Sequence, residues 1–157
     1  MENDPVAEAL SAVGVPLSFR TFPEGTDTAE QAAAAVGCDL GAIVKSLVFV
    51  AGDQFVLALV SGADRLDEAK LATELDAEGS SIRKATAKEV EQQTGFKIGT
   101  VPPLGHRIPM RVLLDRELMM HREIWAASGV RHRVFPISPV MLAAASGATI
   151  AEIRSES

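Results

Sequence analysis

The chain has 157 residues and a net charge of −6, and 47% of its residues are hydrophobic against 23% charged, a composition that excludes disorder and a disulfide scaffold. It has one cysteine, no apolar run near the ~20 residues of a membrane helix, and no signal-peptide pattern at its start. We therefore expect one soluble, cytoplasmic domain over residues 1–157. Its three histidines lie outside metal-motif spacing, so we expect neither a metal ion nor a cofactor.

Charge is divided unevenly along the chain. Residues 1–80 carry four basic and fourteen acidic side chains, a net of −10, whereas residues 81–157 carry eleven basic and seven acidic ones, a net of +4. This asymmetry indicates a basic face in the second half, suited to a polyanion. The alternative is a solvated surface with scattered arginines, because neighbours in sequence need not share one patch in space.

Two helices and a strand are predicted before residue 40. The pair Asp4-Pro5 supplies an N-cap and a first turn, and Gly14 a left-handed stop, for the first helix. Alternating apolar residues over 15–19 indicate a strand. A capping box over 27–30, formed by an aspartate and a glutamate, then begins an alanine-rich helix that ends at Gly37.

A β-hairpin is the clearest element of the sequence. Residues 42–60 are mostly Val, Leu and Phe, interrupted at Gly52-Asp53, a dipeptide typical of a two-residue hairpin turn. Patterns further along predict helices over 67–75, over 86–95 with a Thr86/Glu89 capping box and from Ser138-Pro139, and strands over 81–84, 111–114, 123–127 and 132–136. Together these elements predict an α+β fold with a mixed, mainly antiparallel, curved sheet flanked by helices.

Lys45 is the first candidate for a functional role. Strand alternation places it on one face with Leu47 and Phe49, while the residues between them form a second apolar face. A strand covered on both faces offers an ammonium group no water, and burial of that charge is costly unless it meets an anion. Lys45 therefore either reaches water from the first residue of the strand or points into a ligand cleft.

A loop rich in glycine and proline, Gly95–Gly105, is the second candidate. Prolines fix the backbone and glycines permit close backbone approach, so the remaining amides can point at a ligand oxygen. The loop lacks the ending of a Walker A motif and the spacing of a dinucleotide fingerprint. A rigid connector without a ligand is the alternative.

Conventional catalytic groups are missing from the sequence. It has no Gly-x-Ser-x-Gly elbow, and Cys38, directly after a predicted helix stop, is interpreted as a small buried side chain rather than a nucleophile. Asp115 and Glu117 could pair as acid and base, but their position near a strand end favours a solvated turn. The three histidines lie among arginines and are interpreted as surface or phosphate-side residues rather than as general bases.

Several segments carry, in chain order, a resemblance to a known family: Ile43–Val48 around Lys45, Gly99–Gly105, Asp115, Ser128-Gly129 and Ile137–Pro139. From about Val6 to Ile153 the sequence resembles the YbaK/prolyl-tRNA synthetase-associated domain family. The resemblance implies a small hydrolase, or an inserted editing domain of bacterial prolyl-tRNA synthetase, that removes a wrongly attached amino acid from tRNA.

The resemblance also implies roles for individual residues. Because an aminoacyl ester is already activated, a positioned water molecule suffices as nucleophile. Lys45 matches the family's functionally central lysine and is expected to anchor a phosphate of the terminal adenosine or to position the ester. The backbone amides of Gly99, Thr100 and Val101 would hold the ester carbonyl or the terminal ribose as charge develops. The residues expected to bind the substrate are Ser46, Pro102, Pro103, Gly105, Gly129, Thr28 and Phe49.

Ser46 departs from one subfamily, because members specific for alanine carry asparagine after the lysine. Assignment to the alanine-specific subfamily therefore does not follow. The family resemblance implies a substrate of tRNA-Pro or a related tRNA that carries a small wrong amino acid. Selection among small side chains is expected to be modest, since one methylene is worth about 1–3 kcal/mol. An aminoacyl-tRNA synthetase is a further expected partner.

Two functions remain open at this point. The first is a trans-editing deacylase, and the second is a non-catalytic module that binds tRNA acceptor ends or a synthetase. In both, the residues expected to contact tRNA phosphates are Lys84, Lys88, Arg107, Arg131 and Arg133. A turnover assay with mischarged tRNAs separates the two functions.

Overall fold

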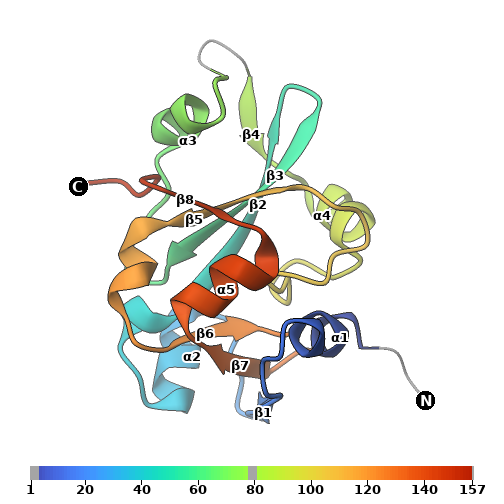
Figure 1. Ribbon diagram of the computed structural model, residues 1–157, viewed down its shortest axis with the longest axis vertical. Coiled ribbons are helices and arrows are strands. Elements are labelled where there is room, and N and C mark those ends of the chain that lie inside the picture. Colours follow the sequence, from blue (N-terminus) through green and yellow to red (C-terminus); the bar gives the residue numbers. More distant parts are fainter. Residues whose placement is uncertain (1–3, 78–80, 157) are drawn as a thin grey trace.

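The computed structural model describes residues 4–77 and 81–156, in which eight strands form two sheets (Figure 1). The larger sheet has the order β4-β2-β3-β5-β8 and the smaller sheet the order β1-β7-β6. The strands are β1 (Arg20–Thr21), β2 (Val44–Ala51), β3 (Gln54–Ser61), β4 (Ile82–Lys84), β5 (Arg111–Asp115), β6 (Ile124–Ala127), β7 (Arg133–Ile137) and β8 (Thr149–Ala151).

The predicted hairpin is confirmed as β2 and β3. Their antiparallel register pairs Val44 with Ser61 and continues to the turn, where Gly52 takes a positive φ of 63°. β5 pairs with β3 in parallel, and β8 pairs with β5 in the same way, so the larger sheet is mixed. The α+β class is confirmed, although its strands form two sheets rather than the single curved sheet that we predicted.

Helices flank both sheets in the described part of the chain. They are α1 (Pro5–Ala12), α2 (Ala29–Val36), α3 (Glu68–Glu74), α4 (Ala87–Thr94) and α5 (Pro139–Ser146), with the short 3-10 helices η1 (Leu40–Ala42) and η2 (Arg116–Met120). The caps predicted for α1, α4 and α5 are confirmed. For α2 the capping box is Thr28 with Gln31 instead of Asp27 with Glu30, because the Thr28 hydroxyl accepts the Gln31 amide at 3.0 Å.

The strand predicted over residues 15–19 is wrong. Pro16 has no amide hydrogen and Leu17 is exposed, and the pairing with β7 begins only at β1. Phe19 packs edge-on against Phe135, with ring centroids 6.1 Å apart. Val15 and Phe19 therefore pack on the core without strand pairing, and Leu17 between them faces solvent. β8, which no pattern in the sequence predicts, is three residues long.

Both faces of the hairpin are buried, as its sequence predicts. One face, with Val48 and Leu57, packs into the cluster that includes residues of α1, α4 and α5. The opposite face, with Phe49 and Val60, packs against Leu71 of α3. Phe49 is 1% exposed and thus belongs to the hydrophobic core.

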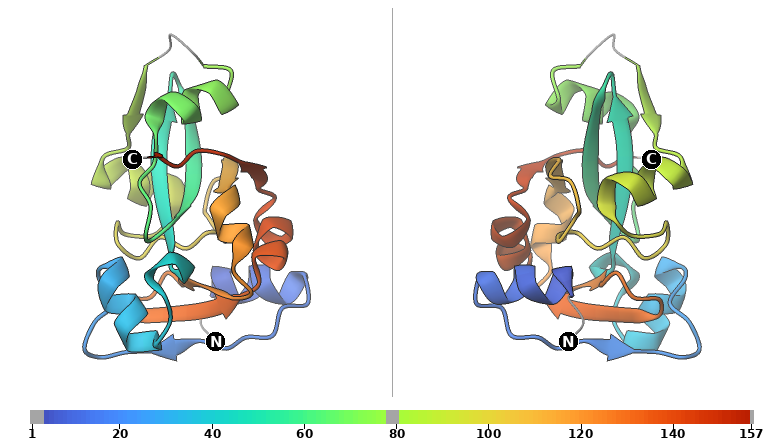
Figure 2. Two further views of the ribbon diagram at one scale, coloured as in Figure 1. Left: turned by 90° about the vertical axis from the view of Figure 1, so that its left-hand side faces the viewer. Right: turned by 90° about the vertical axis from the view of Figure 1, so that its right-hand side faces the viewer.

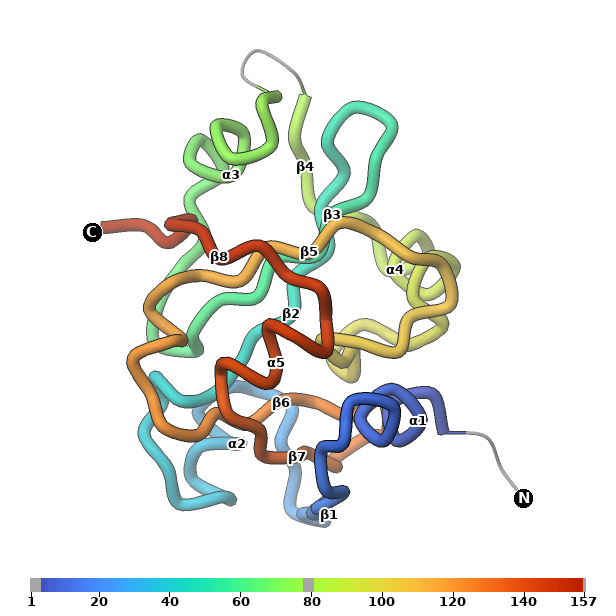
Figure 3. Tube along the Cα trace, in the orientation of Figure 1, coloured from blue at the N-terminus to red at the C-terminus, as the bar shows by residue number. Residues whose placement is uncertain are grey.

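The smaller sheet lies across the base of the hairpin, below the larger sheet (Figure 2). A β-bridge joins Ile43, directly before β2, to Trp125 of β6. These two side chains form a separate apolar cluster with Ala32 and Ala33 of α2 and Val134 of β7. The chain trace shows how α2, β6 and β7, far apart in sequence, come together there (Figure 3). The start of β2 therefore stands at the junction of the two sheets.

Candidate active site

A cavity of about 280 Å³ opens at this junction. Its walls come from the loop before α2, the start of β2, residues 98–101, and strands β6 and β7. Apolar side chains form much of the wall, and the polar and charged ones are Thr26, Asp27, Thr28, Lys45, Ser46, Thr100, His132 and Arg133. A small apolar cavity with a few convergent polar groups is the usual form of a ligand site.

Lys45 is half-buried in the cavity wall. Its Nζ donates a hydrogen bond to the main-chain carbonyl oxygen of Asp64, in the turn after β3. Burial lowers the pKa of Lys45, while the nearby Asp64 carboxylate opposes that shift. Within the described residues Lys45 forms no ion pair, so its charge is available to a phosphate or to an ester oxygen.

The glycine-proline loop contributes residues 98–101 to the cavity wall. Gly99 has a φ of +91°, and no atom lies within 4 Å of the place that a Cβ would take. The amide and the hydroxyl of Thr100 both donate to the carbonyl of Lys97, at 2.9 and 2.8 Å. The Thr100 amide is therefore already occupied, and the backbone donors expected to hold a substrate carbonyl reduce to those of Gly99 and Val101.

A second, more open cavity of about 670 Å³ adjoins the first. The two share Asp27, Ile98, Gly99 and Thr100 in their walls. The second cavity adds Gly95, Phe96, Lys97, Gly129 and Arg131, and so has an aromatic ring and two cations at its sides. The pair forms a two-lobed site with its junction at Asp27 and the loop.

Two buried polar atoms of the first cavity have no hydrogen-bond partner among the described residues: Ser46 Oγ and His132 Nε2. Unpartnered buried polar atoms are costly, so they indicate a polar ligand or water at this wall. Sequence reasoning did not single out His132, which it placed at the surface or beside a phosphate. Its position depends on a left-handed backbone, with a φ of +64°, which no sequence pattern reveals.

The structure brings together only part of the predicted substrate-binding set. Thr28 and Ser46 line the first cavity, and Gly129 lines the second. The remaining four line neither cavity: Pro102, Pro103, Gly105 and Phe49. The role expected for Phe49 is corrected, because its side chain is buried in the core on the hairpin face that packs against Leu71 of α3.

The basic residues expected at tRNA fall into two groups. Lys84, Lys88, Arg107 and Arg131 are exposed. Arg133 needs correction, because its guanidinium donates to Asp4 at 2.8 Å and to Ser128 Oγ at 2.7 Å. This arginine ties β7 to the N-cap of α1, and that contact leaves it little freedom to bind phosphate.

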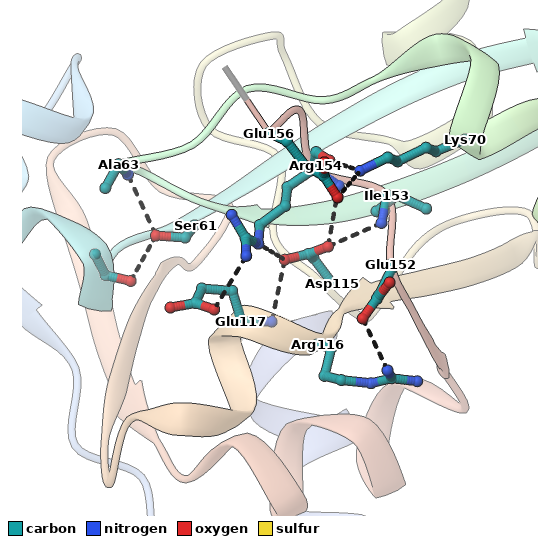
Figure 4. Close-up of polar contacts among 11 residues, drawn as sticks. Ser61, Ala63, Lys70, Asp115, Arg116, Glu117, Glu152, Ile153, Arg154 and Glu156 are labelled. Atoms are coloured by element: carbon teal, nitrogen blue, oxygen red, sulfur yellow. Dashed lines mark hydrogen bonds and ion pairs between the residues drawn. The ribbon is translucent and has the colours of Figure 1, made fainter.

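The sequence predicts a solvated turn at Asp115, but the structure shows a carboxylate bonded within the protein (Figure 4). Its side chain is 0% exposed and accepts the amide hydrogens of Ile153 at 2.9 Å, Arg154 at 3.1 Å and Glu117 at 3.1 Å. The nearest cation is Arg154, 4.0 Å away. Asp115 therefore fixes the C-terminal segment against β5 and has no access to either cavity.

The described residues also bear on the expectations for a metal site, a membrane helix and the Cys38 thiol. Within residues 4–77 and 81–156, no group of three or more His, Cys, Asp or Glu is arranged to hold a metal ion. No helix there is long and apolar enough to cross a membrane. Cys38 is partly buried, and burial raises the pKa of its thiol, which favours the protonated, unreactive form.

The fold and the site define an α+β protein whose lysine-bearing, two-lobed site lies between two sheets. The chain belongs to the aminoacyl-tRNA editing domain family, whose model matches residues 23–145 and so includes Lys45 and the loop. The family resemblance inferred from the sequence is confirmed.

Similar proteins agree with this assignment. The uncharacterized protein YwhH of Bacillus subtilis (strain 168) is 34% identical over 119 residues, covering 75% of this chain and 74% of that protein. The proline–tRNA ligase of Nitratidesulfovibrio vulgaris (strain DP4) is 38% identical over 114 residues, which are 73% of this chain and 18% of the ligase. A crystal structure described as a candidate trans-editing enzyme for prolyl tRNA synthetase is 40% identical, covers 99% of both chains and has a TM-score of 0.88.

Proposed function

We propose that this chain is a trans-acting aminoacyl-tRNA deacylase, which hydrolyses the ester of a small amino acid wrongly attached to tRNA-Pro or a related tRNA. The observation that carries the proposal is the half-buried ammonium of Lys45 in a cavity that is also walled by Gly99–Val101. Family membership and the 40% identical structure support it. In this proposal residues 1–157 act as one editing unit in the cytoplasm, where tRNA is charged, with a synthetase as a further partner.

The two lobes of the site suit the two ends of such a substrate. The smaller, mostly apolar cavity accepts the aminoacyl group, and its volume of about 280 Å³ favours small side chains. The larger cavity accepts the terminal adenosine, because Phe96 offers a ring for stacking and Lys97 and Arg131 offer charges for phosphate. The ester that joins these two parts then lies at the junction, beside Gly99.

Hydrolysis at this junction needs no protein nucleophile. A water oxygen attacks the ester carbonyl carbon, and the bond from that carbon to the ribose oxygen breaks. One proton of the water goes to the ribose oxygen and the other to solvent, so the amino acid leaves as its carboxylate. The amides of Gly99 and Val101 would stabilise the carbonyl oxygen as it becomes negative, and Lys45 would position the ester or an adjacent phosphate. Ser46 Oγ, which has no hydrogen-bond partner within the described chain, and His132 Nε2, which has none there and lies 3.5 Å from Asp27 Oδ1, would hold the water or the aminoacyl group.

The test is release of amino acid from a panel of mischarged tRNAs, with and without the cognate synthetase. We expect turnover of at least one tRNA carrying a small wrong amino acid, and its loss in Lys45→Ala. Lys70→Ala is the matched control, because Lys70 Nζ also donates to a main-chain carbonyl, that of Arg154 at 2.9 Å, and lines neither cavity. Binding of tRNA without turnover of any member of the panel would contradict the proposal and favour a non-catalytic module.

A further inference from the structure

Asp27 holds a distinctive position in the site. Among the described residues it is the single acidic side chain in the walls of the two cavities, and it lines both of them. The other charged groups in these walls are cationic: Lys45 and Arg133 in the first cavity, Lys97 and Arg131 in the second. Phosphate and ester carbonyl oxygens are hydrogen-bond acceptors, which a carboxylate does not bind, so Asp27 suits a donor or a cationic group of the substrate.

The backbone holds Asp27 firmly in this position. Its amide donates to Gln31 Oε1 at 3.0 Å, and the same oxygen accepts the amide of Thr28 at 3.4 Å. The capping box of α2 therefore fixes the loop from which the carboxylate projects. This arrangement fixes the main chain at Asp27 before a ligand arrives, which reduces the entropy lost when the side chain binds.

The Asp27 carboxylate has only long contacts within the described chain. Arg131 and His132 each approach it at 3.5 Å, and the side chains of Asp27 and Arg131 are 56% and 71% exposed. The Arg131–Asp27 pair is an exposed ion pair of this length, which contributes little and opens easily. The carboxylate therefore has acceptor capacity left for a cation that enters the junction.

An aminoacyl ester with an unblocked amino group brings such a cation to the junction. Its α-amino group is attached to the carbon next to the ester carbonyl, and α-amino groups, with pKa values of about 7.7–8.0, are largely protonated at neutral pH. If the ester lies at the junction of the lobes, the ammonium lies within reach of the same wall. We propose that Asp27 binds the α-ammonium of the aminoacyl group, so that the enzyme selects esters with a free amino group over N-blocked ones.

This inference rests on the proposed function, and its test compares one amino acid in two forms. The substrates are an aminoacyl-tRNA that the wild-type chain hydrolyses and the same tRNA with the amino group acetylated. We expect kcat/KM to be at least about tenfold higher for the free form, the range of a hydrogen bond to a charged group. In Asp27→Asn this preference should fall to within about threefold, through loss of activity on the free form. Glu24→Gln, at an exposed carboxylate nearby in sequence that lines neither cavity, should keep the wild-type preference.

A second measurement separates the inference from the proposed function. Binding is measured with 3′-aminoacylamino-3′-deoxyadenosine, which carries a stable amide in place of the ester, and with its N-acetyl form. Tighter binding of the free amine by the wild type, and equal binding of both by Asp27→Asn, supports the ammonium site even if no ester is hydrolysed. Equal binding by the wild type, or an unchanged preference in Asp27→Asn, overturns it even if deacylation is observed. If Asp27→Asn instead weakens both forms equally and Arg131→Ala does the same, Asp27 only positions Arg131, and the inference is wrong.

Discussion

Gly129 lies against the ring of Phe96, so that a Cβ at Gly129 would be 2.4 Å from Cε1 of that ring. The close approach joins the turn after β6 to the loop after α4, and both residues line the second cavity. The Gly129 amide adds a hydrogen bond to the carbonyl of Thr100 at 3.0 Å. The glycine thus sets the distance between two walls of the proposed adenosine lobe.

Gly129→Ala should therefore lower the free energy of unfolding by about 1–3 kcal/mol, through strain at φ +85° and the clash with Phe96. Chemical denaturation measures this. Gly14→Ala is the control, because Gly14 also has a positive φ, +78°, but has no atom within 4 Å of a Cβ. Adding Phe96→Ala should remove most of the extra cost at Gly129. Additive effects of the two changes would show that the ring gives way without cost.

Lys45→Ala should reduce deacylation by about 100- to 1,000-fold, the range for removal of one electrostatic contact in a transition state. The fold should persist, because the side chain makes a single hydrogen bond, to Asp64, at a partly exposed position. Turnover with saturating tRNA and the melting temperature are the two measurements. A variant that melts early and loses activity in proportion to its unfolded fraction would instead indicate a structural lysine. Lys45→Arg, which keeps the charge and changes the shape, should recover part of the rate.

Asp115→Ala should destabilise the fold by about 2–5 kcal/mol, because it leaves three amide hydrogens without their acceptor at a buried position. Activity per folded molecule should not change, since Asp115 lines neither cavity. Urea denaturation and the KM for aminoacyl-tRNA check the two statements. The nearby surface pair of Arg116 and Glu152, at 2.9 Å, is the contrast, and Arg116→Ala should cost less than about 1 kcal/mol.

Asp115 also shows where sequence reasoning stops. Its partners Ile153 and Arg154 are 38 and 39 residues away, so the local pattern at the end of β5 cannot reveal that the carboxylate is buried. The hairpin and the caps of α1 and α4 are determined by residues close in sequence, and these predictions are correct. The same limit applies to His132, because its place in the cavity follows from a backbone angle and from tertiary packing.

The candidate site, like the fold, was predicted from the sequence only where local patterns determine it. Strand alternation and the cost of an unpaired ammonium were enough to single out Lys45, and the spacing of glycine and proline singled out the loop. Neither pattern contains the contact of Lys45 with Asp64, the occupied amide of Thr100 or the position of Asp27 between the lobes. These features depend on how β2, α2 and the loop meet in three dimensions.

The Glu89 carboxylate makes the free energy of unfolding depend on pH in the acid range. The Arg83 guanidinium, bonded to this carboxylate at 2.7 Å, is the main cause that lowers the pKa of Glu89 from 4.5 to about 2. Between these pH values the unfolded chain binds more protons than the folded one, so acid favours unfolding. The stabilisation is complete above pH 4.5 and is lost as the pH falls through about 2. Glu89→Gln should reduce the free energy of unfolding at pH 7, and its difference from the wild type should shrink below pH 4.5. A difference that is constant down to pH 2 would contradict the linkage.

The exposed basic residues should control affinity for tRNA without affecting the choice of amino acid. Alanine at Lys84, Lys88, Arg107 or Arg131 should raise KM by a similar factor for every aminoacyl-tRNA, because phosphate contacts position the nucleic acid and do not select the aminoacyl group. Ser46→Ala should do the reverse, changing the preference among amino acids with little effect on the binding of uncharged tRNA. Both are read from steady-state kinetics on two mischarged tRNAs.

Salt dependence tests the same surface independently. Each phosphate neutralised by one of these side chains should contribute about 0.7–0.9 to the slope of log K against log salt, so each alanine variant should reduce the slope by about that amount. Arg133→Ala should leave the slope unchanged and lower stability instead, because its guanidinium is already bonded to Asp4 and Ser128. If the four exposed variants bind tRNA as the wild type does, with the same slope, the positive charge of the second half is not a binding face. The acceptor end would then be held through Lys45, Lys97 and the loop, and the slope of the Lys97→Ala variant would show whether that contact is ionic.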